Sequence, residues 1–268
     1  MLLAINCGNT NVVFAVYDGP KQRGVWRAAT EPRRTADEYL VWLKELMGLD
    51  GIRPKDIDGA IISIVVPDAL FALKTLCRRY FACDPLVVGE DGCNLGIEAK
   101  VDHSAEVGAD RLVNSVAAHS RYGGPLIVVD FGTATTFDVV DEGGNYCGGV
   151  IAPGIQLSLQ ALYLGTAKLP KVAIKRPDKV IGTNTTACIQ SGVYWGYVGL
   201  IEGTIERIRA EFGGPMKVVA TGGLASLFND ATDAIEQAEP DLTLRGLCEI
   251  YVLNRGNNAH RKHKHRSR

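Results

Sequence analysis

The sequence has no long apolar run, no paired-cysteine motif and no strong net charge. Its apolar stretches are all shorter than the roughly 20 residues that cross a bilayer, and the first is interrupted at Asn6. We therefore expect neither a membrane anchor nor a signal peptide. Seven cysteines without C-x-x-C spacing exclude the common zinc motifs and a disulfide framework, and indicate a reducing cytoplasm. A net charge of −1 gives no overall attraction to nucleic acid.

The sequence also lacks the G-x-x-x-x-G-K-[ST] loop, which excludes the commonest nucleotide-binding kinase scaffold. It opens instead with two apolar, β-rich runs at 2–7 and 11–17, around the turn "GNTN". Gly8 is expected to let the backbone turn with a positive φ, and Thr10 and Asn11 offer side-chain donors, so the turn could form an anion-binding concavity. Taken alone, the same pattern is also typical of a plain hairpin.

A second segment, 125–144, repeats this opening pattern. An apolar strand ends in Asp130, a turn follows with Gly132 and Thr133, and a second strand comes next. Such self-similarity indicates a duplicated unit. Asp130 could merely accept hydrogen bonds from turn amides. Two such turns from facing halves would instead form a phosphate clamp, so the duplication favours nucleotide binding.

The spacing of apolar residues predicts an α/β protein. We expect further strands at 24–30, 59–66, 85–89, 146–154 and 216–223, and helices at 35–49, 68–81, 155–169 and 185–213. Thr35 and Glu38 form a capping-box pattern, and a helix is expected to start near Asp110. Gly192 and Gly203 bound the region where the helix at 185–213 is expected to break.

These elements predict two similar lobes with a cleft between them. We assign residues 1–118 to an N-terminal lobe and 119–255 to a C-terminal lobe. Residues 256–268 form a basic tail, with five Lys or Arg and three His in its last nine positions. Composition of this kind predicts a disordered, solvated segment.

A third motif, "EVGADRLVN", carries the acid–base chemistry. Asp110 could accept the proton of a substrate hydroxyl, and Arg111 could hold an anionic substrate by a forked contact. Two simpler alternatives are that Asp110 caps the following helix or that the pair forms a salt bridge. A fourth motif, "ATGG" at 220–223, would allow a flat ring such as adenine to approach, although such a pair usually marks a turn.

In this order the motifs resemble those of type III pantothenate kinases, in the acetate kinase–sugar kinase–Hsp70–actin superfamily. The resemblance runs from Leu2 to about Asn254, and "GADR" followed by "DFGTATTFD" is its most specific part. The other matching segments are "GNTN", "GGVIAPGI", "AKLP", "IGTNT", "QSGVYWGYVGLIEG" and "ATGG". The resemblance implies two ribonuclease H-like lobes. It also implies ATP-dependent phosphorylation of pantothenate to 4′-phosphopantothenate, the first step of coenzyme A biosynthesis.

The resemblance also implies roles for individual residues. Asp110 would be the catalytic proton acceptor, and Asp130 would help to hold a monovalent cation, K⁺ or NH₄⁺, beside the Mg²⁺ that accompanies ATP. ATP would contact Asn6, Cys7, Gly8, Asn9, Thr10, Asn11, Val12, Val13 and Thr133. Pantothenate would contact Val101, Gly108, Ala109, Asp110, Arg111 and Thr185. The resemblance further implies a homodimer in which the segment 191–203 contributes to the contact.

Three departures from the family pattern bear on activity. The family usually has Asp at the position of Asn6, Tyr at the position of Val101, and Asn-Pro where this chain has His103-Ser104. Our hypothesis is that Asn6 is tolerated and the chain is an active kinase. The alternatives are a weakened pseudokinase that acts as a ligand-binding accessory protein, and a kinase for another small hydroxylated acid.

Overall fold

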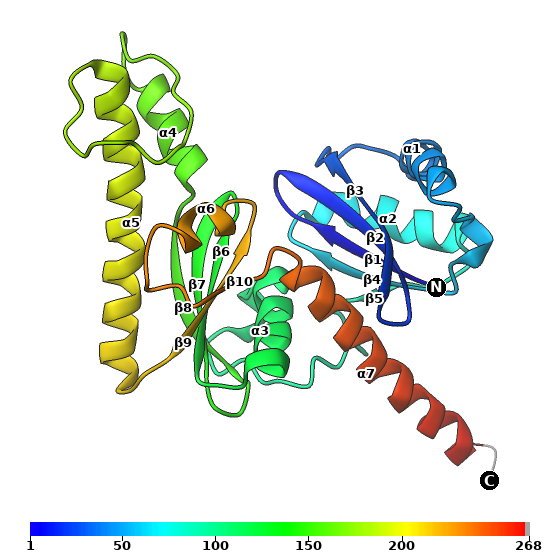
Figure 1. The fold of residues 1–268 in the computed structure, drawn as a ribbon. Coiled ribbons are helices and arrows are strands. Elements are labelled where there is room, and N and C mark those ends of the chain that lie inside the picture. Colours follow the sequence, from blue (N-terminus) through cyan, green and yellow to red (C-terminus); the bar gives the residue numbers. More distant parts are fainter. Residues whose placement is uncertain (266–268) are drawn as a thin grey trace. The chain divides into compact units, whose positions relative to one another are not determined.

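The structure is a computed structural model that describes the backbone of residues 1–265 and the side chains of residues 1–255 (Figure 1). The chain divides into two compact units. Unit 1 contains Met1–Glu98, Asp102–Ala117 and the chain from Leu242 onward, and unit 2 contains Ala99–Val101 and Ala118–Asp241. No described helix combines the length and the apolar character required to traverse a bilayer.

Unit 1 is built on a five-stranded sheet of order β3-β2-β1-β4-β5. Its strands are β1 (Leu2–Cys7), β2 (Asn11–Asp18), β3 (Lys21–Ala29), β4 (Gly59–Ile64) and β5 (Leu86–Val87). Its helices are α1 (Ala36–Leu49), α2 (Pro67–Tyr80), the unit 1 part of α3 (Ala109–Tyr122), α7 (Leu242–His265), and the short η1 (Pro54–Asp56) and η2 (Ser104–Glu106). The capping box predicted from Thr35 and Glu38 is present at the start of α1.

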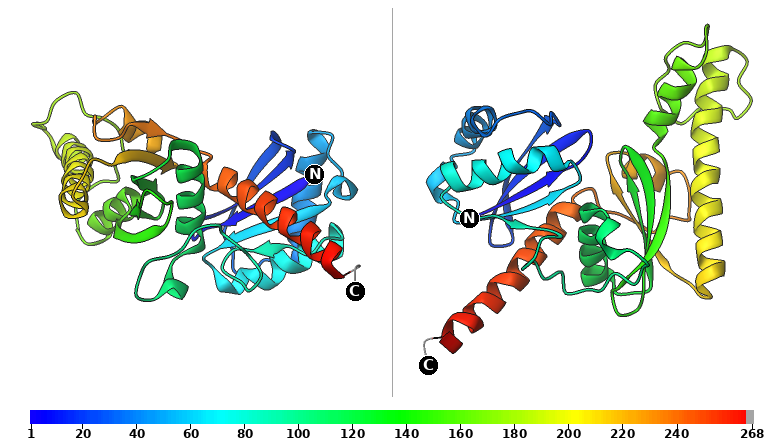
Figure 2. Two further views of the ribbon diagram at one scale, coloured as in Figure 1. Left: turned by 90° about the horizontal axis from the view of Figure 1, so that it is seen from below. Right: turned by 180° about the vertical axis from the view of Figure 1, so that it is seen from behind.

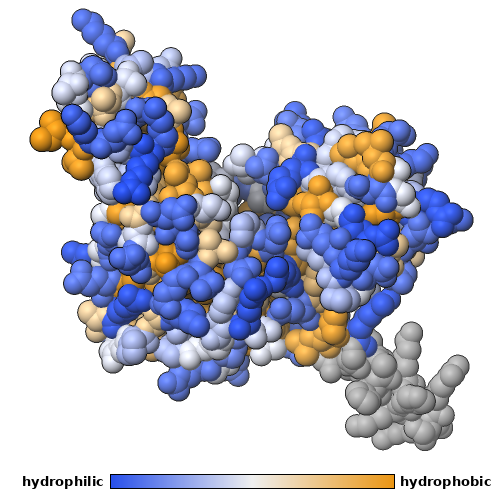
Figure 3. All heavy atoms as spheres, in the orientation of Figure 1, coloured by the Kyte–Doolittle hydropathy of each residue, from blue (hydrophilic) through white to orange (hydrophobic). Residues whose placement is uncertain are grey.

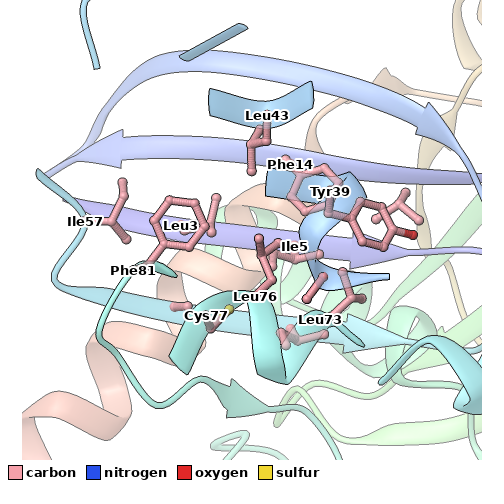
Figure 4. Close-up of a cluster of buried hydrophobic side chains, with 14 of the residues drawn as sticks. Leu3, Ile5, Phe14, Tyr39, Leu43, Ile57, Leu73, Leu76, Cys77 and Phe81 are labelled. Carbon is pink, nitrogen blue, oxygen red and sulfur yellow. The ribbon is translucent and has the colours of Figure 1, made fainter. Parts of the chain in front are cut away.

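Strand alternation gives the sheet of unit 1 two different buried faces. One face carries Leu3, Ile5 and Phe14, which pack against α1 and α2 in a continuous core (Figure 4). The opposite face carries Ala4 and Ile61, which pack against Ala109 and Val113 of α3 and against Leu247 of α7. Both faces are therefore covered, and α3 is fixed to the same face that carries the even-numbered residues of β1.

Unit 2 repeats this topology. Its sheet has the order β8-β7-β6-β9-β10, so β6 and β7 correspond to β1 and β2. The strands are β6 (Leu126–Phe131), β7 (Ala134–Val140), β8 (Tyr146–Pro153), β9 (Lys217–Gly222) and β10 (Gln237–Ala238). In both sheets the first three strands are antiparallel, and the last two run parallel to the first. The predicted duplicated α/β fold is confirmed.

Helices α4 (Ile155–Leu164), α5 (Thr185–Phe212) and α6 (Ala225–Asn229) belong to unit 2. Tyr194, Val198 and Ile201 of α5 are buried against Ile127 and Val129 of β6. The predicted break in α5 is wrong, because the helix runs unbroken for 28 residues (Figure 2). Each interior glycine costs a helix only about 1 kcal/mol, and the packing of the buried side of α5 outweighs that cost.

The end of the chain also differs from the expected organisation. Helix α7 was expected in the second lobe, residues 119–255, but it belongs to unit 1, where Leu244, Leu247 and Ile250 pack on the first sheet. The backbone of α7 continues as a helix to His265, into the segment 256–268 that we expected to be disordered. The last three positions of that segment, 266–268, lie outside the described residues.

Candidate active site

The first hairpin turn exposes the residues that were expected to hold phosphate. Asn9, Thr10 and Asn11 are exposed, and the N–H of Gly8 donates to the carbonyl oxygen of Asn11 over 3.0 Å. Gly8 is not one of the described glycines with a positive φ, so that part of the expectation for the turn is wrong. Cys7, in contrast, points into the core beneath α1 and α2, where burial raises the pKa of its thiol to about 11. Cys7 and the equally buried Val12 can therefore offer a ligand only their backbone.

Asn6 lies on the opposite face of β1 from Cys7. Its register partners are Val13 on β2 and Ser63 on β4. Ser63 is fully buried, and within the described part of the chain its hydroxyl group has no hydrogen-bond partner. An amide and an unsatisfied hydroxyl therefore stand side by side at the end of two neighbouring strands. Sequence reasoning missed Ser63, whose only signal is a polar residue inside the apolar run "AIISIVV".

Asp110 lies in the first turn of α3, directly after Ala109, which packs on the same sheet face. Its Oδ1 accepts a hydrogen bond from the backbone N–H of Arg111 over 2.8 Å. Burial raises the pKa of Asp110, and this hydrogen bond and the Arg111 charge only partly oppose the effect. Unit 1 thus brings Asn6, Ser63 and the turn of α3 that carries Asp110 to one face of its sheet.

Gly108 lies close to the carboxylate of Asp110. A Cβ atom at position 108 would fall 2.7 Å from Oδ1 of Asp110, closer than real Cβ contacts allow. The glycine of "GADR" therefore leaves room for the carboxylate.

Asp130 ends the corresponding strand of unit 2. Its partner on β9 is the buried Thr221, and the next residue, Gly222, has a φ of +90°. A Cβ atom at position 222 would lie 2.6 Å from Oδ1 of Asp130, so only glycine lets the backbone approach the carboxylate this closely. The glycine pair of "ATGG" thus shapes the surroundings of Asp130.

Thr133 lies in the exposed turn that follows Asp130 and β6. The backbone N–H of Gly154, the residue after β8, donates to the carbonyl oxygen of Thr133 over 3.0 Å. Tyr197 of α5 supports the turn from the core side, because its hydroxyl donates to Pro153 over 3.1 Å and contacts Thr135 Oγ1 at 2.5 Å. Nothing in the sequence signalled the role of Tyr197.

Sequence reasoning also missed Asp138. This carboxylate is completely buried in β7 and accepts a hydrogen bond from Thr136 Oγ1 over 3.0 Å. Thr136 is the register partner of Asp130, so Asp130, Thr136 and Asp138 share one face of the second sheet. The signal was an acidic residue within the apolar stretch "TFDVV".

The two remaining predicted pantothenate residues belong to unit 2, whereas Gly108 to Arg111 belong to unit 1. Val101 belongs to unit 2, in a short segment that pairs with β8 through Lys100 N–H and the Tyr146 carbonyl at 2.7 Å. Thr185 is exposed at the start of α5, whose N-cap is Asn184. The described contacts connect Thr185 neither to Val101 nor to Thr133. The predicted site residues are thus distributed over both units.

The oxygen donors present suit hard cations. Asn6, Ser63 and Asp130 supply amide, hydroxyl and carboxylate oxygens, and Gly222 leaves space beside Asp130 that a Cβ would fill. Mg²⁺ is commonly held by one or two protein oxygens together with substrate phosphates and water. Among the described residues there is no cluster of three or more His, Cys, Asp or Glu side chains that could hold a metal without such help.

Comparison with known structures gives the same fold. A conserved Baf family protein from Campylobacter jejuni superposes with a TM-score of 0.60 at 17% identity, over 95% of this chain and 99% of that one. The ethanolamine utilization protein EutJ from Carboxydothermus hydrogenoformans gives a TM-score of 0.51 at 15% identity, over 91% and 88% of the two chains. At these identities the similarity concerns the fold alone.

Sequence comparison is more specific. The family profile of type III pantothenate kinases matches residues 2–207. The type III pantothenate kinase of Paramagnetospirillum magneticum is 63% identical over 254 residues, which cover 95% of this chain and 98% of the relative. That of Rhodospirillum rubrum is 62% identical over 254 residues, covering 95% and 99%. With the duplicated fold and the retained "GADR" and "DFGTATTFD" segments, these similarities establish that the chain belongs to the type III pantothenate kinase family.

Proposed function

We propose that the protein transfers the γ-phosphoryl group of ATP to the primary hydroxyl group of pantothenate, which yields 4′-phosphopantothenate and ADP. The observation that carries this proposal is the partly buried carboxylate of Asp110 in the segment "GADR", beside Arg111. Identity of 63% to a family member over almost the whole chain supports pantothenate as the substrate. This reaction is the first step of coenzyme A biosynthesis.

In the proposed reaction Asp110 accepts the proton of the pantothenate hydroxyl as its oxygen attacks the γ-phosphorus. The bond from that phosphorus to the bridging β–γ oxygen breaks, and ADP leaves with the electron pair. Such transfers depend mainly on positioning and on neutralising phosphate charge, with little covalent work for the protein. The burial that raises the pKa of Asp110 makes it a stronger base than an exposed aspartate.

The other residues bind and orient. Backbone N–H groups of the turn after β1, together with Thr133 of the second turn, would hold the ATP phosphates. Gly108, Ala109, Arg111, Val101 and Thr185 would surround pantothenate, with the Arg111 guanidinium facing its carboxylate. Asn6 and Ser63 would hold Mg²⁺ through its bound water, and Asp130 would hold K⁺ or NH₄⁺. When bound, these cations offset the charge of the triphosphate.

A homodimer belongs to the same proposal. Of the aromatic residues of 191–203 that suggested an interface, Tyr194 and Tyr197 are buried inside unit 2 and Trp195 is partly buried, whereas Gly192, Gly196 and Gly199 are exposed on α5. Large apolar side chains are exposed nearby (Figure 3). They are Val150, Ile151, Leu157, Leu162, Leu164, Val180 and Ile181. Exposed apolar side chains of this number in unit 2 support a protein partner, here a second copy of the chain.

The proposed location is the cytoplasm. All seven cysteines are unpaired, in keeping with a reducing compartment, and ATP is available there as the phosphoryl donor.

A ligand-binding accessory protein without turnover is the second candidate, favoured only by the amide at Asn6. The test is to incubate the purified protein with ATP, Mg²⁺, K⁺ and a panel of small hydroxylated acids, and to identify products by mass spectrometry. The proposal predicts 4′-phosphopantothenate as the main product. A different phosphorylated acid would support another substrate, and binding of ATP without any product would support the accessory role.

A further inference from the structure

Thr30, the residue directly after β3, is tied to the first hairpin turn by two hydrogen bonds. Its backbone N–H donates to the carbonyl oxygen of Thr10 over 2.9 Å, and its side-chain Oγ1 donates to the carbonyl oxygen of Gly8 over 2.6 Å. Within the turn itself, the backbone N–H of Gly8 donates to the carbonyl oxygen of Asn11. A residue far away in the sequence therefore supplies two of these three bonds.

These two bonds determine which way the peptide groups of the turn face. The cis peptide bond among the described residues is Gly124–Pro125, so the 8–9 and 10–11 peptides are trans. In a trans peptide the C=O and N–H groups point in opposite directions. With the Gly8 and Thr10 carbonyls directed at Thr30, the N–H groups of Asn9 and Asn11 point away from it. Carbonyl oxygens, which would repel phosphate, are thus held on the side of β3.

Unit 2 contains the same arrangement with one bond fewer. Gly154, directly after β8, donates its N–H to the Thr133 carbonyl, but a Cβ at position 154 would lie 2.3 Å from that oxygen. Position 154 therefore has no side chain to make a second bond. The two turns also differ in length. In unit 1, four residues lie between Cys7 and Val12, the last paired residues of the two strands. In unit 2, three residues lie between the corresponding pair, Phe131 and Thr135.

We propose that Thr30 is a positioning residue for the ATP phosphates: its hydroxyl group compensates for the extra residue in the first turn by fixing the Gly8–Asn9 peptide with its N–H toward the nucleotide. This inference rests on the proposed function, since it assumes that the turn binds phosphate. Without the side-chain bond the turn has to be ordered when ATP binds, and that ordering lowers affinity.

The experiment compares Thr30→Val, which keeps the shape and the backbone bond, with Thr30→Ser, which restores the hydroxyl. Thr75→Val is the matched control, because Thr75 Oγ1 makes the same kind of bond, 2.8 Å to the Phe71 carbonyl, within α2. For each variant we would measure the Kd of MgATP by calorimetry, the KM values of ATP and pantothenate, and the Tm. A single hydrogen bond predicts a weakening of MgATP binding by about 3- to 10-fold in Thr30→Val.

The expected pattern is a raised Kd and KM for ATP in Thr30→Val, an unchanged KM for pantothenate, and recovery to within about twofold in Thr30→Ser. Thr75→Val should bind MgATP like the unaltered protein. Unchanged MgATP affinity in Thr30→Val would overturn the inference, even with a lower Tm, because Thr30 would then serve stability alone. Thr30→Ala provides the same comparison if the valine variant does not fold. If the unaltered protein neither binds MgATP nor phosphorylates pantothenate, the proposed function itself fails.

Discussion

At the scale of single residues, the proposed chemistry depends on which carboxylate is desolvated by the surrounding protein. Asp110 is partly buried in the first turn of α3 and its pKa is raised, although Arg111 is its direct neighbour. Desolvation therefore outweighs the adjacent positive charge and the backbone hydrogen bond. Asp56 shows the reverse, because its hydrogen bonds with Arg53 lower its pKa to about 2. The surroundings thus shift the pKa of the same type of side chain in opposite directions.

The raised pKa of Asp110 predicts the pH dependence of catalysis. A base must be ionised, so kcat/KM should fall as the pH drops through the raised pKa, at a higher pH than for an ordinary aspartate. The ionised form is also disfavoured in the folded state, so the stability linked to this group is present at low pH and is lost as the pH rises through the folded pKa. A pH–rate profile and a pH series of Tm values measure both effects. An acid limb at or below the usual aspartate range would contradict the assignment.

Substitution of Ser63 tests whether its hydroxyl group serves ligand binding or the stability of the fold. Its hydroxyl is fully buried and, among the described residues, lacks a partner. Ser63→Ala removes an unsatisfied polar group and should raise the free energy of unfolding of the ligand-free protein by about 1 kcal/mol. If the hydroxyl serves the Mg²⁺ bound beside Asn6, the same variant should bind MgATP more weakly. Denaturant unfolding and calorimetry measure the two quantities, and a variant that is less stable without ligand would contradict this account.

Candidate site residues could be predicted from the sequence where they belong to a short motif. Asp110, Arg111 and Asp130 stand out because each is charged and adjoins an apolar strand or a predicted helix start. Ser63, Asp138 and Tyr197 were missed, because their importance arises from strand register and from packing between elements distant in the sequence. A single sequence does not contain that pairing information.

At the scale of elements, the two hairpins are similar in sequence but differ in geometry. The sequence pattern aligns the turns residue for residue, whereas the strand register gives the first turn one residue more. Each turn is held by the residue that follows the third strand, Thr30 or Gly154. The hairpins and the capping box of α1 were predictable from local sequence, because turn and capping interactions span only a few residues.

Gly154 tests how closely the second turn must be packed. A Cβ at this position would lie 2.3 Å from the Thr133 carbonyl oxygen and 2.7 Å from that of Gly132. Gly154→Ala should therefore displace the turn, weaken MgATP binding by about 10-fold or more, and lower stability by about 1–3 kcal/mol. Gly214→Ala is the matched control, since a Cβ there would have no neighbour within 4 Å. Equal nucleotide affinity in the two variants would show that the second turn does not contact ATP.

The continuous helix α5 shows where local propensity fails as a guide. Glycines at 192, 196, 199 and 203 suggested a break, but the residues between them, including Tyr194, Val198 and Ile201, bury one side of the helix. Tertiary packing decides the outcome, and it was invisible in the composition of the segment. Gly192, Gly196 and Gly199 are instead exposed on one side of the helix, and Gly203 is partly buried.

At the scale of the whole molecule, the chain contains two units with the same sheet topology, and its last helix, α7, belongs to the first of them. Each sheet is followed by one helix, α3 after the first and α7 after the second. Helix α7 then packs on the first sheet, through Leu244, Leu247 and Ile250. The repeat itself was predictable from the sequence, because both halves carry the same strand–turn–strand pattern. The packing of α7 on the first sheet was not predictable, because the apolar residues of α7 do not indicate which of the two sheets they contact.

The exposed apolar surface of unit 2 predicts the oligomeric state. Ile181 is 82% exposed, and in the proposed homodimer it belongs to the covered surface. Ile181→Glu should shift the protein from dimer to monomer in sedimentation velocity, because a charge would be buried without a partner. Leu49→Glu is the matched control, as Leu49 of α1 is 84% exposed and lies in unit 1. A monomeric unaltered protein, or a dimer unaffected by Ile181→Glu, would contradict this interface.

The measurement that tests the central claim most directly is a coupled assay of ATP turnover with and without pantothenate, in Mg²⁺ and K⁺. It compares the unaltered protein with Asp110→Asn, Asn6→Asp and the exposed control Asp91→Asn. We predict pantothenate-dependent turnover in the unaltered protein, retained in Asn6→Asp and Asp91→Asn, and reduced by about 10²- to 10⁴-fold in Asp110→Asn. Turnover that appears only after Asn6→Asp, or that survives Asp110→Asn, would contradict the account.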